Sequence, residues 1–246
     1  MGIVEIKKAE ERRQLLHLLS KKKLIILDID DTLIKSCPAI IQHHIDTAKK
    51  IGIRVPTKRE ILNLISNPWT KILVKVWPEM KDKKKIAEFK KVYRSFPKWL
   101  PITVIPGAIN TLKKLKKNYL LTIITGRDEY SLKKLLPELG IDLSQFTVIC
   151  HGDDKITKPD PKVFEFALKR INYKLRINQD NNTNNKLRNI KKLTKKNVVY
   201  IGDTLLDANC AKKANVDFIA VLTGHFKRRD FRRYNCAVVD SVKELI

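Results

Sequence analysis

Short apolar runs alternate with amphipathic stretches along most of the chain. The apolar runs have the length of strands and cover residues 24–27, 120–125, 146–150, 198–201, 218–222 and 237–239. Between several of them, apolar residues recur at the spacing of a helix that buries one face. Strands that alternate with helices form mainly parallel sheets, covered on both faces and joined by right-handed crossovers. The pattern therefore predicts an α/β fold.

Residues 36–104 interrupt this alternation with a pattern that is almost wholly helical. Residues 36–38 are Ser-Cys-Pro, which suits a helix start because proline fits the first helical position, and Gly52 suits the helix end. Residues 57–60 are Thr-Lys-Arg-Glu, a capping box ahead of a second helix. Apolar spacing over residues 79–94 predicts a further helix.

These patterns divide the chain into two predicted domains. Residues 1–35 and 105–246 are expected to form a Rossmann-like core, and residues 36–104 a helical cap inserted after the first strand. A chain of 246 residues is long enough for one large domain with a smaller insertion. The tryptophans of the cap are expected in its interior: Trp69, Trp77 and Trp99.

Three other segments give local predictions. Residues 7–19 predict an amphipathic helix that packs against the edge of the core. Residues 172–197 contain too few apolar side chains to offset the entropy of ordering them, so we expect a mobile surface loop with a short helix around 187–193. Ser241 is a residue type that caps helices and predicts a short terminal one.

Charge restricts the kind of partner. Lys and Arg total 51 against 26 Asp and Glu, which gives a formal net charge of +25. Such an excess raises the concentration of anions around the molecule. Nucleic acid and small phosphate esters are both candidates, but no nucleic-acid-binding motif accompanies the charge. We therefore expect dedicated nucleic-acid binding to be the less favoured of the two, and a small phosphorylated metabolite remains a candidate partner.

Hydropathy and cysteine spacing indicate a cytoplasmic protein. No apolar run approaches the roughly 20 residues that span a membrane, so no membrane partner is expected. The four cysteines lie far apart and form no Cys-x-x-Cys pair, which argues against a structural zinc site and for reduced thiols.

The first apolar run leads directly into carboxylates. Residues 24–27 are followed by Asp28, Asp30 and Asp31. Asp28 and Asp30 are two residues apart, so both can point into one crevice if extended backbone persists. Ligands of open α/β sheets bind beyond the carboxyl ends of the strands. We therefore expect the functional site at this edge of the sheet.

Other predicted strand ends bring further polar groups to the same edge. They are Thr125, then Lys158 in a following loop, then Asp203 with Asp207. So many carboxylates with one lysine would repel one another strongly unless a divalent cation offsets their charge. Oxygen ligands favour Mg²⁺.

Taken together, these residues resemble the haloacid dehalogenase-like superfamily. Its four motifs appear in order: Asp28-Ile-Asp30-Asp31-Thr32, Thr125, Lys158, and Gly202-Asp203 with Asp207. The resemblance covers most of residues 24–224 and implies a phosphotransfer enzyme. Asp31 departs from the pattern, because many relatives have glycine there.

The resemblance also implies roles for these residues. Asp28 would attack phosphorus and become an aspartyl-phosphate, and Asp30 would act as general acid and then general base. Thr125 and Lys158 would hold the phosphoryl oxygens. Mg²⁺ would be bound by Asp28, the backbone carbonyl of Asp30, and Asp203, with Asp207 as a supporting residue or a further ligand.

Asp30 helps to choose among branches of the superfamily, because members that cleave carbon–halogen bonds lack an acid at that position. The cap, with residues 152–154 leading to residues 158–161, resembles the phosphoglycolate-phosphatase-like branch. The resemblance thus implies a Mg²⁺-dependent phosphatase for a small phosphate monoester. Alternatives are a phosphatase for nucleotides or nucleic-acid ends, a phosphomutase, and a non-catalytic binding protein. The oligomeric state is left open by the sequence.

Overall fold

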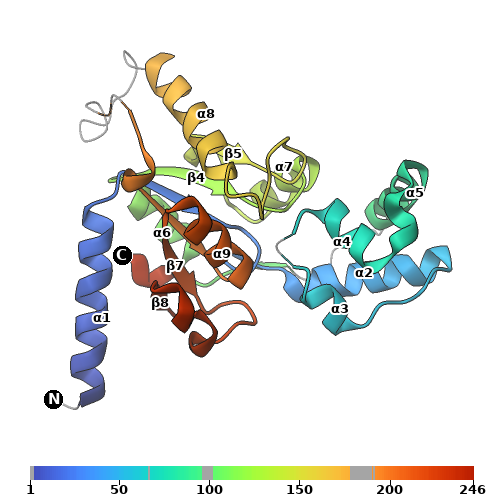
Figure 1. Ribbon diagram of the computed structural model, residues 1–246, viewed down its shortest axis with the longest axis horizontal. Helices are drawn as coiled ribbons and strands as arrows, with labels where there is room; N and C mark the ends of the chain where they lie inside the picture. The colour runs from blue at the N-terminus through green and yellow to red at the C-terminus, as the bar shows by residue number, and fades with distance from the viewer. Residues whose placement is uncertain (1–2, 66, 96–101, 178–189, 191) are drawn as a thin grey trace.

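A six-stranded parallel sheet lies at the centre of the protein (Figure 1). The structure, a computed structural model, describes residues 3–65, 67–95, 102–177, 190 and 192–246, with side chains from residue 9 onward. Every neighbouring pair of strands is parallel. The order across the sheet is β5 (Val148–Cys150), β4 (Leu120–Ile124), β1 (Leu24–Leu27), β6 (Val198–Gly202), β7 (Asp217–Val221) and β8 (Ala237–Val239). The predicted α/β fold is confirmed.

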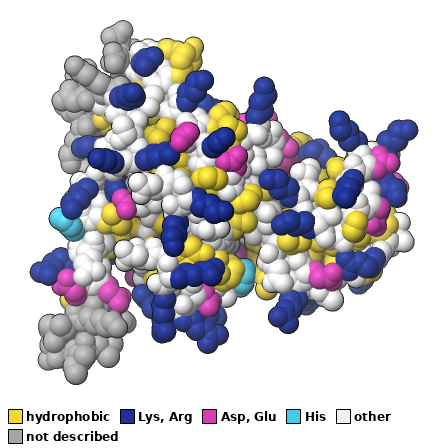
Figure 2. Space-filling view, in the orientation of Figure 1, with side chains coloured by type: hydrophobic (Ala, Val, Ile, Leu, Met, Phe, Trp, Pro, Cys, Tyr) yellow, Lys and Arg dark blue, Asp and Glu magenta, His cyan; other side chains and the backbone are white. Residues whose placement is uncertain are grey.

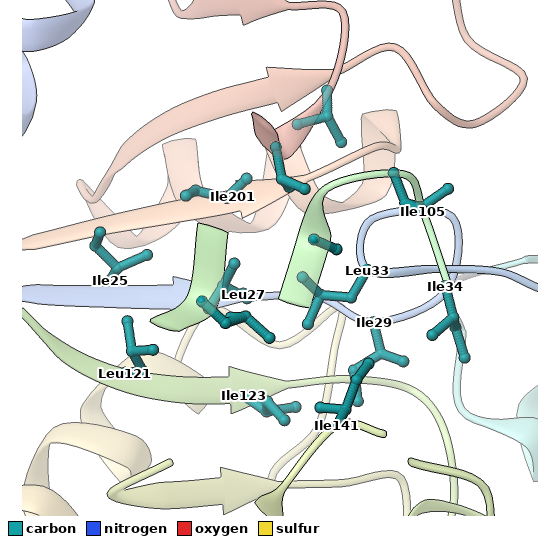
Figure 3. Packing of buried hydrophobic residues seen from close by; sticks show 14 of the residues in the cluster. Ile25, Leu27, Ile29, Leu33, Ile34, Ile105, Leu121, Ile123, Ile141 and Ile201 are labelled. Atoms are coloured by element: carbon teal, nitrogen blue, oxygen red, sulfur yellow. The ribbon is translucent and has the colours of Figure 1, made fainter. Parts of the chain in front are cut away.

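Helices cover both faces of this sheet because its strands are apolar on both sides. Ile25 and Leu27 point into one core cluster, shown in Figure 3, whereas Leu24 and Ile26 point into the other. The first face is covered by α1 (Ile3–Ser20), α6 (Ala108–Lys116) and α7 (Glu129–Glu138). The second is covered by α8 (Val163–Ile177) and α9 (Leu205–Ala214). As predicted, α1 packs near a sheet edge, where it contacts β8.

A group of helices lies at the far side of the sheet from α1 (Figure 1). We call it the helical unit: α2 (Cys37–Ile51), α3 (Lys58–Leu62), α4 (Trp69–Val76), the 3₁₀ helix Pro78–Lys81 and α5 (Lys83–Ser95). The unit has its own core around Leu73, Trp77 and Phe89. Two short antiparallel strands, β2 (Ile34–Lys35) and β3 (Thr103–Val104), flank it. The sequence pattern did not specify α4, β2 or β3.

Most predicted helix ends are observed. Gly52 ends α2 in the left-handed conformation, and Thr57 and Glu60 form the capping box of α3. The prediction for Ser241 is confirmed for the short terminal helix and wrong for the capping hydrogen bond. A 3₁₀ helix, Val242–Leu245, follows it, but the buried Ser241 hydroxyl makes no hydrogen bond with any described group.

The polar segment 172–197 is more ordered at its start than predicted, because α8 continues to Ile177. Asn172 donates from Nδ2 to the carbonyl of Leu193 (3.0 Å) and accepts at Oδ1 from its N–H (2.8 Å). This amide pair fixes the return of the chain toward β6. The short helix predicted around residues 187–193 lies largely outside the described residues.

The remaining regular segments are short 3₁₀ helices: Leu143–Gln145, Lys195–Asn197 and Arg228–Tyr234. Lys and Arg side chains are spread over both the sheet-containing part and the helical unit on the face shown in Figure 2. All four cysteines are free thiols. Among the helices that the structure describes, none has the length and apolar character needed to cross a membrane.

Candidate active site

The site lies where the strand order changes direction. The central strand β1 has β4 on one side and β6 on the other. The chain adds β4 and β5 on the first side of β1, and then β6, β7 and β8 on the second. Ligands of doubly wound sheets bind in the crevice at such a point. Asp28 follows β1, Thr125 follows β4 and Asp203 follows β6. The structure therefore brings Asp28 together with groups that are 97 and 175 residues further along the chain.

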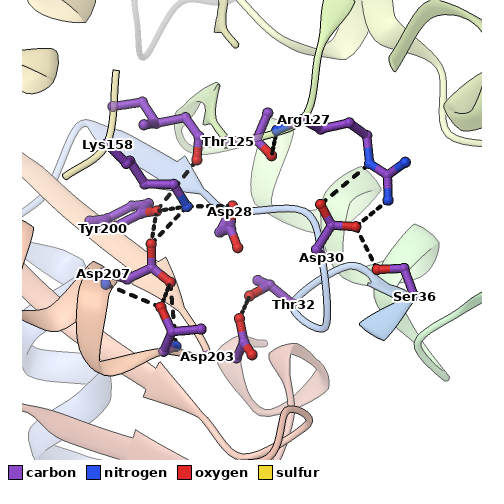
Figure 4. Close-up of polar contacts among 12 residues, drawn as sticks. Asp28, Asp30, Thr32, Ser36, Thr125, Arg127, Lys158, Tyr200, Asp203 and Asp207 are labelled. Atoms are coloured by element: carbon purple, nitrogen blue, oxygen red, sulfur yellow. Dashed lines mark hydrogen bonds and ion pairs between the residues drawn. The ribbon is translucent and has the colours of Figure 1, made fainter. Parts of the chain in front are cut away.

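A buried lysine links two of the predicted carboxylates (Figure 4). The Nζ atom of Lys158 lies 2.8 Å from Oδ1 of Asp28 and 2.8 Å from Oδ1 of Asp207. Tyr200 accepts from the same Nζ at 3.2 Å and donates to Asp207 at 2.6 Å. All four side chains are buried. Tyr200 was not predicted as a site residue, because an aromatic residue in an apolar strand looks like an ordinary core residue.

Asp207 is held firmly in this network. Its Oδ1 accepts from Lys158 and Tyr200, and its Oδ2 accepts from the backbone N–H and the hydroxyl of Thr204. The capping box of α9, formed by Thr204 and Asp207, fixes the carboxylate at the helix start. Both oxygens are thus engaged, which favours the supporting role for Asp207 over direct metal binding.

Asp203 completes the acidic cluster. One ligand atom from each of Asp28, Asp203 and Asp207 lies within 4.8 Å of the others. Thr32 donates to Oδ1 of Asp203 at 3.4 Å. Gly224 packs directly on this carboxylate, since a Cβ atom at position 224 would lie 2.0 Å from Oδ2 of Asp203. Glycine at 224 leaves the space that Asp203 occupies.

Burial dominates the electrostatics of the cluster. It raises the pKa of Asp28 to about 7, against the opposing effect of the Lys158 ammonium and with the help of Asp207. Burial and the Asp28 charge raise the pKa of Asp203 well above its usual range. For Lys158, burial alone would lower the pKa, but the carboxylates of Asp207 and Asp28 raise it. Lys158 therefore stays charged. Its single positive charge is not enough to stabilise the buried negative charge of Asp28 and Asp203.

This imbalance fits a divalent cation. Three buried carboxylates face one ammonium, and the raised pKa values of Asp28 and Asp203 mean that the cost of burying these two charges is incompletely offset. The donors are all oxygens, as Mg²⁺ prefers. Asp28 and Asp203 are the residues here with oxygen atoms outside the Lys158–Asp207 network.

Gly224→Ala tests whether Asp203 needs this space. The added methyl must displace the Asp203 carboxylate, so we expect Mg²⁺ affinity to fall by roughly 10- to 100-fold, the cost typical of disturbing a group that orients a metal ligand. Titration calorimetry with MgCl₂ measures this. Gly52→Ala is the control: Gly52 has open space around it but a φ of +71°, so the change should lower stability and leave Mg²⁺ affinity unchanged, because Gly52 lies at the end of α2 and outside the acidic cluster. Unchanged affinity in Gly224→Ala would contradict the assignment.

The side chain of Asp30 points away from this cluster (Figure 4). Arg127 forms an ion pair with Asp30, and its Nε lies 3.3 Å from Oδ2. The hydroxyl of Ser36 donates to Oδ1 of the same carboxylate. Burial acts to lower the pKa of Arg127, but Asp30 more than offsets it and the pKa is raised. Arg127 and Ser36 were not predicted as site residues, although both lie within six residues of a motif residue.

Thr125 lies beside this ion pair. It is buried, and its hydroxyl accepts from the backbone N–H of Arg127 at 3.2 Å. Its predicted contact with a phosphoryl group stays a prediction.

Asp31 occupies the position where many relatives have glycine. Its backbone conformation is one that glycine adopts freely and that aspartate tolerates. Its φ is +54°, in the left-handed region. Its Oδ1 accepts from the N–H groups of Ser36 (3.0 Å) and Cys37 (3.2 Å) at the start of α2. The carboxylate of Asp31 thus ties the turn after β1 to the helical unit.

Asp31→Ala should lower the free energy of unfolding by about 1–3 kcal/mol, because it leaves buried N–H groups without their acceptor and places alanine at positive φ. Asp31→Asn is the matched control, since asparagine retains the oxygen and tolerates this conformation. Urea unfolding compares the two. Equal losses in both variants would show that the negative charge, and not the acceptor geometry, matters.

A cavity connects this site with the helical unit. Its volume is about 60 Å³. Asp28, Asp30 and Arg127 line it from the sheet side, and Trp69 and Tyr93 from the helical unit. The prediction that tryptophans of this region are interior holds for Trp77. Trp69 is half-buried and also lines the cavity, whereas Trp99 lies outside the described residues.

Comparison with known proteins identifies the family. The chain matches the model of the haloacid dehalogenase-like hydrolases over residues 25–221, and it belongs to that family. The resemblance predicted from the four motifs is therefore confirmed.

The individual proteins that the chain resembles have low sequence identity to it. The (S)-2-haloacid dehalogenase 4A of Burkholderia cepacia is 31% identical over 71 residues, which are 28% of this chain and 31% of that enzyme. A protein from Bacteroides fragilis described as a haloacid dehalogenase-like hydrolase has a TM-score of 0.73 at 22% identity, covering 92% of this chain and all of the other. A predicted phosphoglycolate phosphatase from Haemophilus somnus has a TM-score of 0.70 at 17% identity, covering 92% and 96%. These structures share the fold.

Proposed function

We propose that the protein is a Mg²⁺-dependent phosphatase that hydrolyses a small phosphate monoester through an aspartyl-phosphate. The observation that carries this proposal is the pairing of buried Asp28 with Lys158 at 2.8 Å, beside Asp203. Asp28 also lines a cavity together with Asp30. A carboxylate nucleophile, a fixed cation and a nearby second carboxyl group are what a two-step phosphoryl transfer requires.

In the first step, an oxygen of Asp28 attacks phosphorus and the bond from phosphorus to the ester oxygen breaks. Asp30 gives its proton to the departing alcohol. In the second step, water attacks phosphorus, its proton passes to Asp30, and the Asp28 carboxylate is restored as inorganic phosphate leaves. Lys158 and Thr125 would hold the phosphoryl oxygens in both steps.

Asp28, the backbone carbonyl of Asp30, and Asp203 would hold Mg²⁺. The ion, when bound, supplies positive charge that offsets the carboxylates and the charge on the phosphoryl oxygens. In this assignment Asp207 supports the site by holding Lys158, as their 2.8 Å contact suggests.

Asp30 must change partners to act as an acid. In the structure its carboxylate is paired with Arg127 and Ser36. Substrate binding would have to replace this pair for Asp30 to carry a proton to the ester oxygen. Ser36 stands at the start of α2, so the position of Asp30 depends on the helical unit.

Asp30 also favours phosphate esters over organic halides. The curated relative is a 2-haloacid dehalogenase, but the similarity covers only 28% of this chain. Halide loss needs no proton on the departing group, whereas an alcohol does. A carboxyl group that lines the same cavity as Asp28 supports the second chemistry.

The helical unit would act as a cap, with its boundaries near residues 36 and 104. Ile40 of α2 and Trp69 of α4 line the cavity opposite Asp28. A cap in this position excludes water from the reacting groups. The paired strands β2 and β3 are where the chain enters and leaves the unit.

A screen of phosphorylated metabolites with and without Mg²⁺ tests the proposal. We expect release of inorganic phosphate that requires Mg²⁺. Conversion of a sugar phosphate to its isomer without phosphate release would instead identify a mutase. Binding to a DNA or RNA strand with a steep salt dependence, and phosphate release from its ends, would favour the nucleic-acid alternative.

A further inference from the structure

The wall of the cavity opposite the acidic cluster is apolar. Among the described residues that line it, those of the helical unit are Ile40, Ile65, Asn67, Trp69, Ile72 and Tyr93. Five of these six have large hydrocarbon or aromatic surfaces, and they face Asp28 and Asp30 across the space. In a phosphomonoesterase, the part of the substrate that occupies this side is the departing alcohol. The lining therefore bears on which alcohol is accepted.

Most polar groups of the lining are already engaged by the protein, but the buried indole N–H of Trp69 has no hydrogen-bond partner among the described residues. Arg127 donates to Asp30 and, through Nη1, to the hydroxyl of Ser131 at 3.2 Å. Asp128 accepts from the N–H of Ser131 (3.1 Å) and pairs with Arg94 (3.2 Å). Asn67 donates to a backbone carbonyl at 2.8 Å. One hydroxyl of a polyol could accept from the Trp69 N–H, but its other hydroxyl groups would have to displace these bonds, which gives little net gain.

The charges disfavour a second anionic group on the substrate. Among the described lining residues, Arg127 is the only cation, and it is paired with Asp30. Asp28 and Asp128 add further negative charge to the same cavity. Even when Asp30 leaves Arg127 to act as an acid, a carboxylate on the alcohol would compete with three carboxylates of the lining, those of Asp28, Asp30 and Asp128, for this one guanidinium. The cavity volume of about 60 Å³ is small beside the roughly 300–1,000 Å³ of typical ligand pockets, which favours a small alcohol.

From this lining we propose that the substrate of this site is a phosphate ester of a small, uncharged and mainly apolar alcohol, whose hydrocarbon part packs against Ile40, Trp69 and Ile72. This inference rests on the proposed phosphatase function and specifies its substrate class. It distinguishes the site from one for phosphoglycolate, whose alcohol carries a carboxylate, and from one for sugar phosphates.

Three primary-alcohol esters of similar size test the proposal: butyl phosphate, glycerol 1-phosphate and phosphoglycolate. We expect kcat/KM for butyl phosphate to exceed that of the other two by roughly 10- to 100-fold, from the burial of three or four methylene groups. Higher kcat/KM for phosphoglycolate or glycerol 1-phosphate would overturn the proposal.

Binding of stable analogues separates this inference from the proposed reaction. In pentylphosphonate, 3,4-dihydroxybutylphosphonate and 3-phosphonopropionate, a methylene replaces the ester oxygen. Titration calorimetry with Mg²⁺ present should show pentylphosphonate binding roughly 10-fold or more tightly than the other two. That result without turnover of any ester would refute the phosphatase proposal and leave the apolar site supported. Equal or weaker binding of pentylphosphonate would overturn the inference, whether or not esters are hydrolysed.

Ile40→Gln locates the effect in the cavity wall. Ile40 is only partly buried, so the change should be tolerated by the fold, and we expect kcat/KM for butyl phosphate to fall by roughly 10-fold with a smaller change for glycerol 1-phosphate. Ile53→Gln is the matched control, because Ile53 is a half-buried isoleucine of the helical unit outside the cavity. An equal loss for both esters in Ile40→Gln would contradict the assignment of the wall.

Discussion

Asp28→Asn is expected to lower kcat for hydrolysis of 4-nitrophenyl phosphate by roughly 10³-fold or more. The asparagine amide has no anionic oxygen, so it cannot form the acyl-phosphate bond. The change is nearly isosteric, and Lys158 keeps its 2.8 Å contact with Asp207. A burst of bound phosphate after mixing with substrate, present in the parent protein and absent in the variant, would identify the lost step.

Stability distinguishes this loss from misfolding. A raised pKa means that folding disfavours the charged Asp28, so the stability contributed by its proton is lost as pH rises from about 4 through about 7. At pH 8 without Mg²⁺, Asp28→Asn should therefore unfold with a free energy equal to or above that of the parent. Asp240→Asn, on an exposed aspartate, is the control and should keep parental activity. Hydrolysis by Asp28→Asn near the parental rate would remove Asp28 from the nucleophile role.

Lys158→Met is expected to reduce the free energy of unfolding by about 3–5 kcal/mol at pH 8, because it leaves buried Asp28 and Asp207 without their shared cation. Hydrolysis should also fall by roughly 10²-fold or more, since a fixed positive charge near the phosphoryl oxygens is lost. Urea unfolding and steady-state kinetics measure the two effects separately.

The pH dependence of this loss has a definite sign. Lowering the pH protonates the carboxyl groups that lost their cation, beginning with those whose pKa is already raised. The destabilisation of Lys158→Met should therefore be smaller at pH 5 than at pH 8. Lys162→Met is the matched control on an exposed lysine of the same loop and should stay within about 0.5 kcal/mol of the parent. A destabilisation that grows at low pH would contradict the electrostatic explanation.

The six sheet strands could be predicted from the sequence because each is a local apolar run. The alternation of Leu24 and Ile26 with Ile25 and Leu27 between two cores is a property of any extended segment buried on both faces. The polar residues at the strand ends followed from the same reasoning, since parallel strands finish at one edge of the sheet. Helix ends marked by local residues, such as Gly52 and Thr57, were predictable for the same reason.

Other features depend on contacts between segments far apart in the chain. The capping hydrogen bond expected from Ser241 does not form, because its hydroxyl is buried where no described group accepts from it or donates to it. Asn172 was assigned to a loop from composition, but it closes a hydrogen-bonded pair with Leu193. Composition measures average hydropathy and cannot reveal a single amide whose partner is 21 residues away.

The sequence by itself determined the fold class, the acidic residues of the site and the edge of the sheet where they meet, because these follow from periodicity and strand direction. Only the tertiary structure placed Arg127 on Asp30, Tyr200 on Asp207 and Gly224 against Asp203. It also decided that an apolar wall from the helical unit faces these groups. Such pairings arise from how elements pack, and nothing in the local pattern of either partner encodes them.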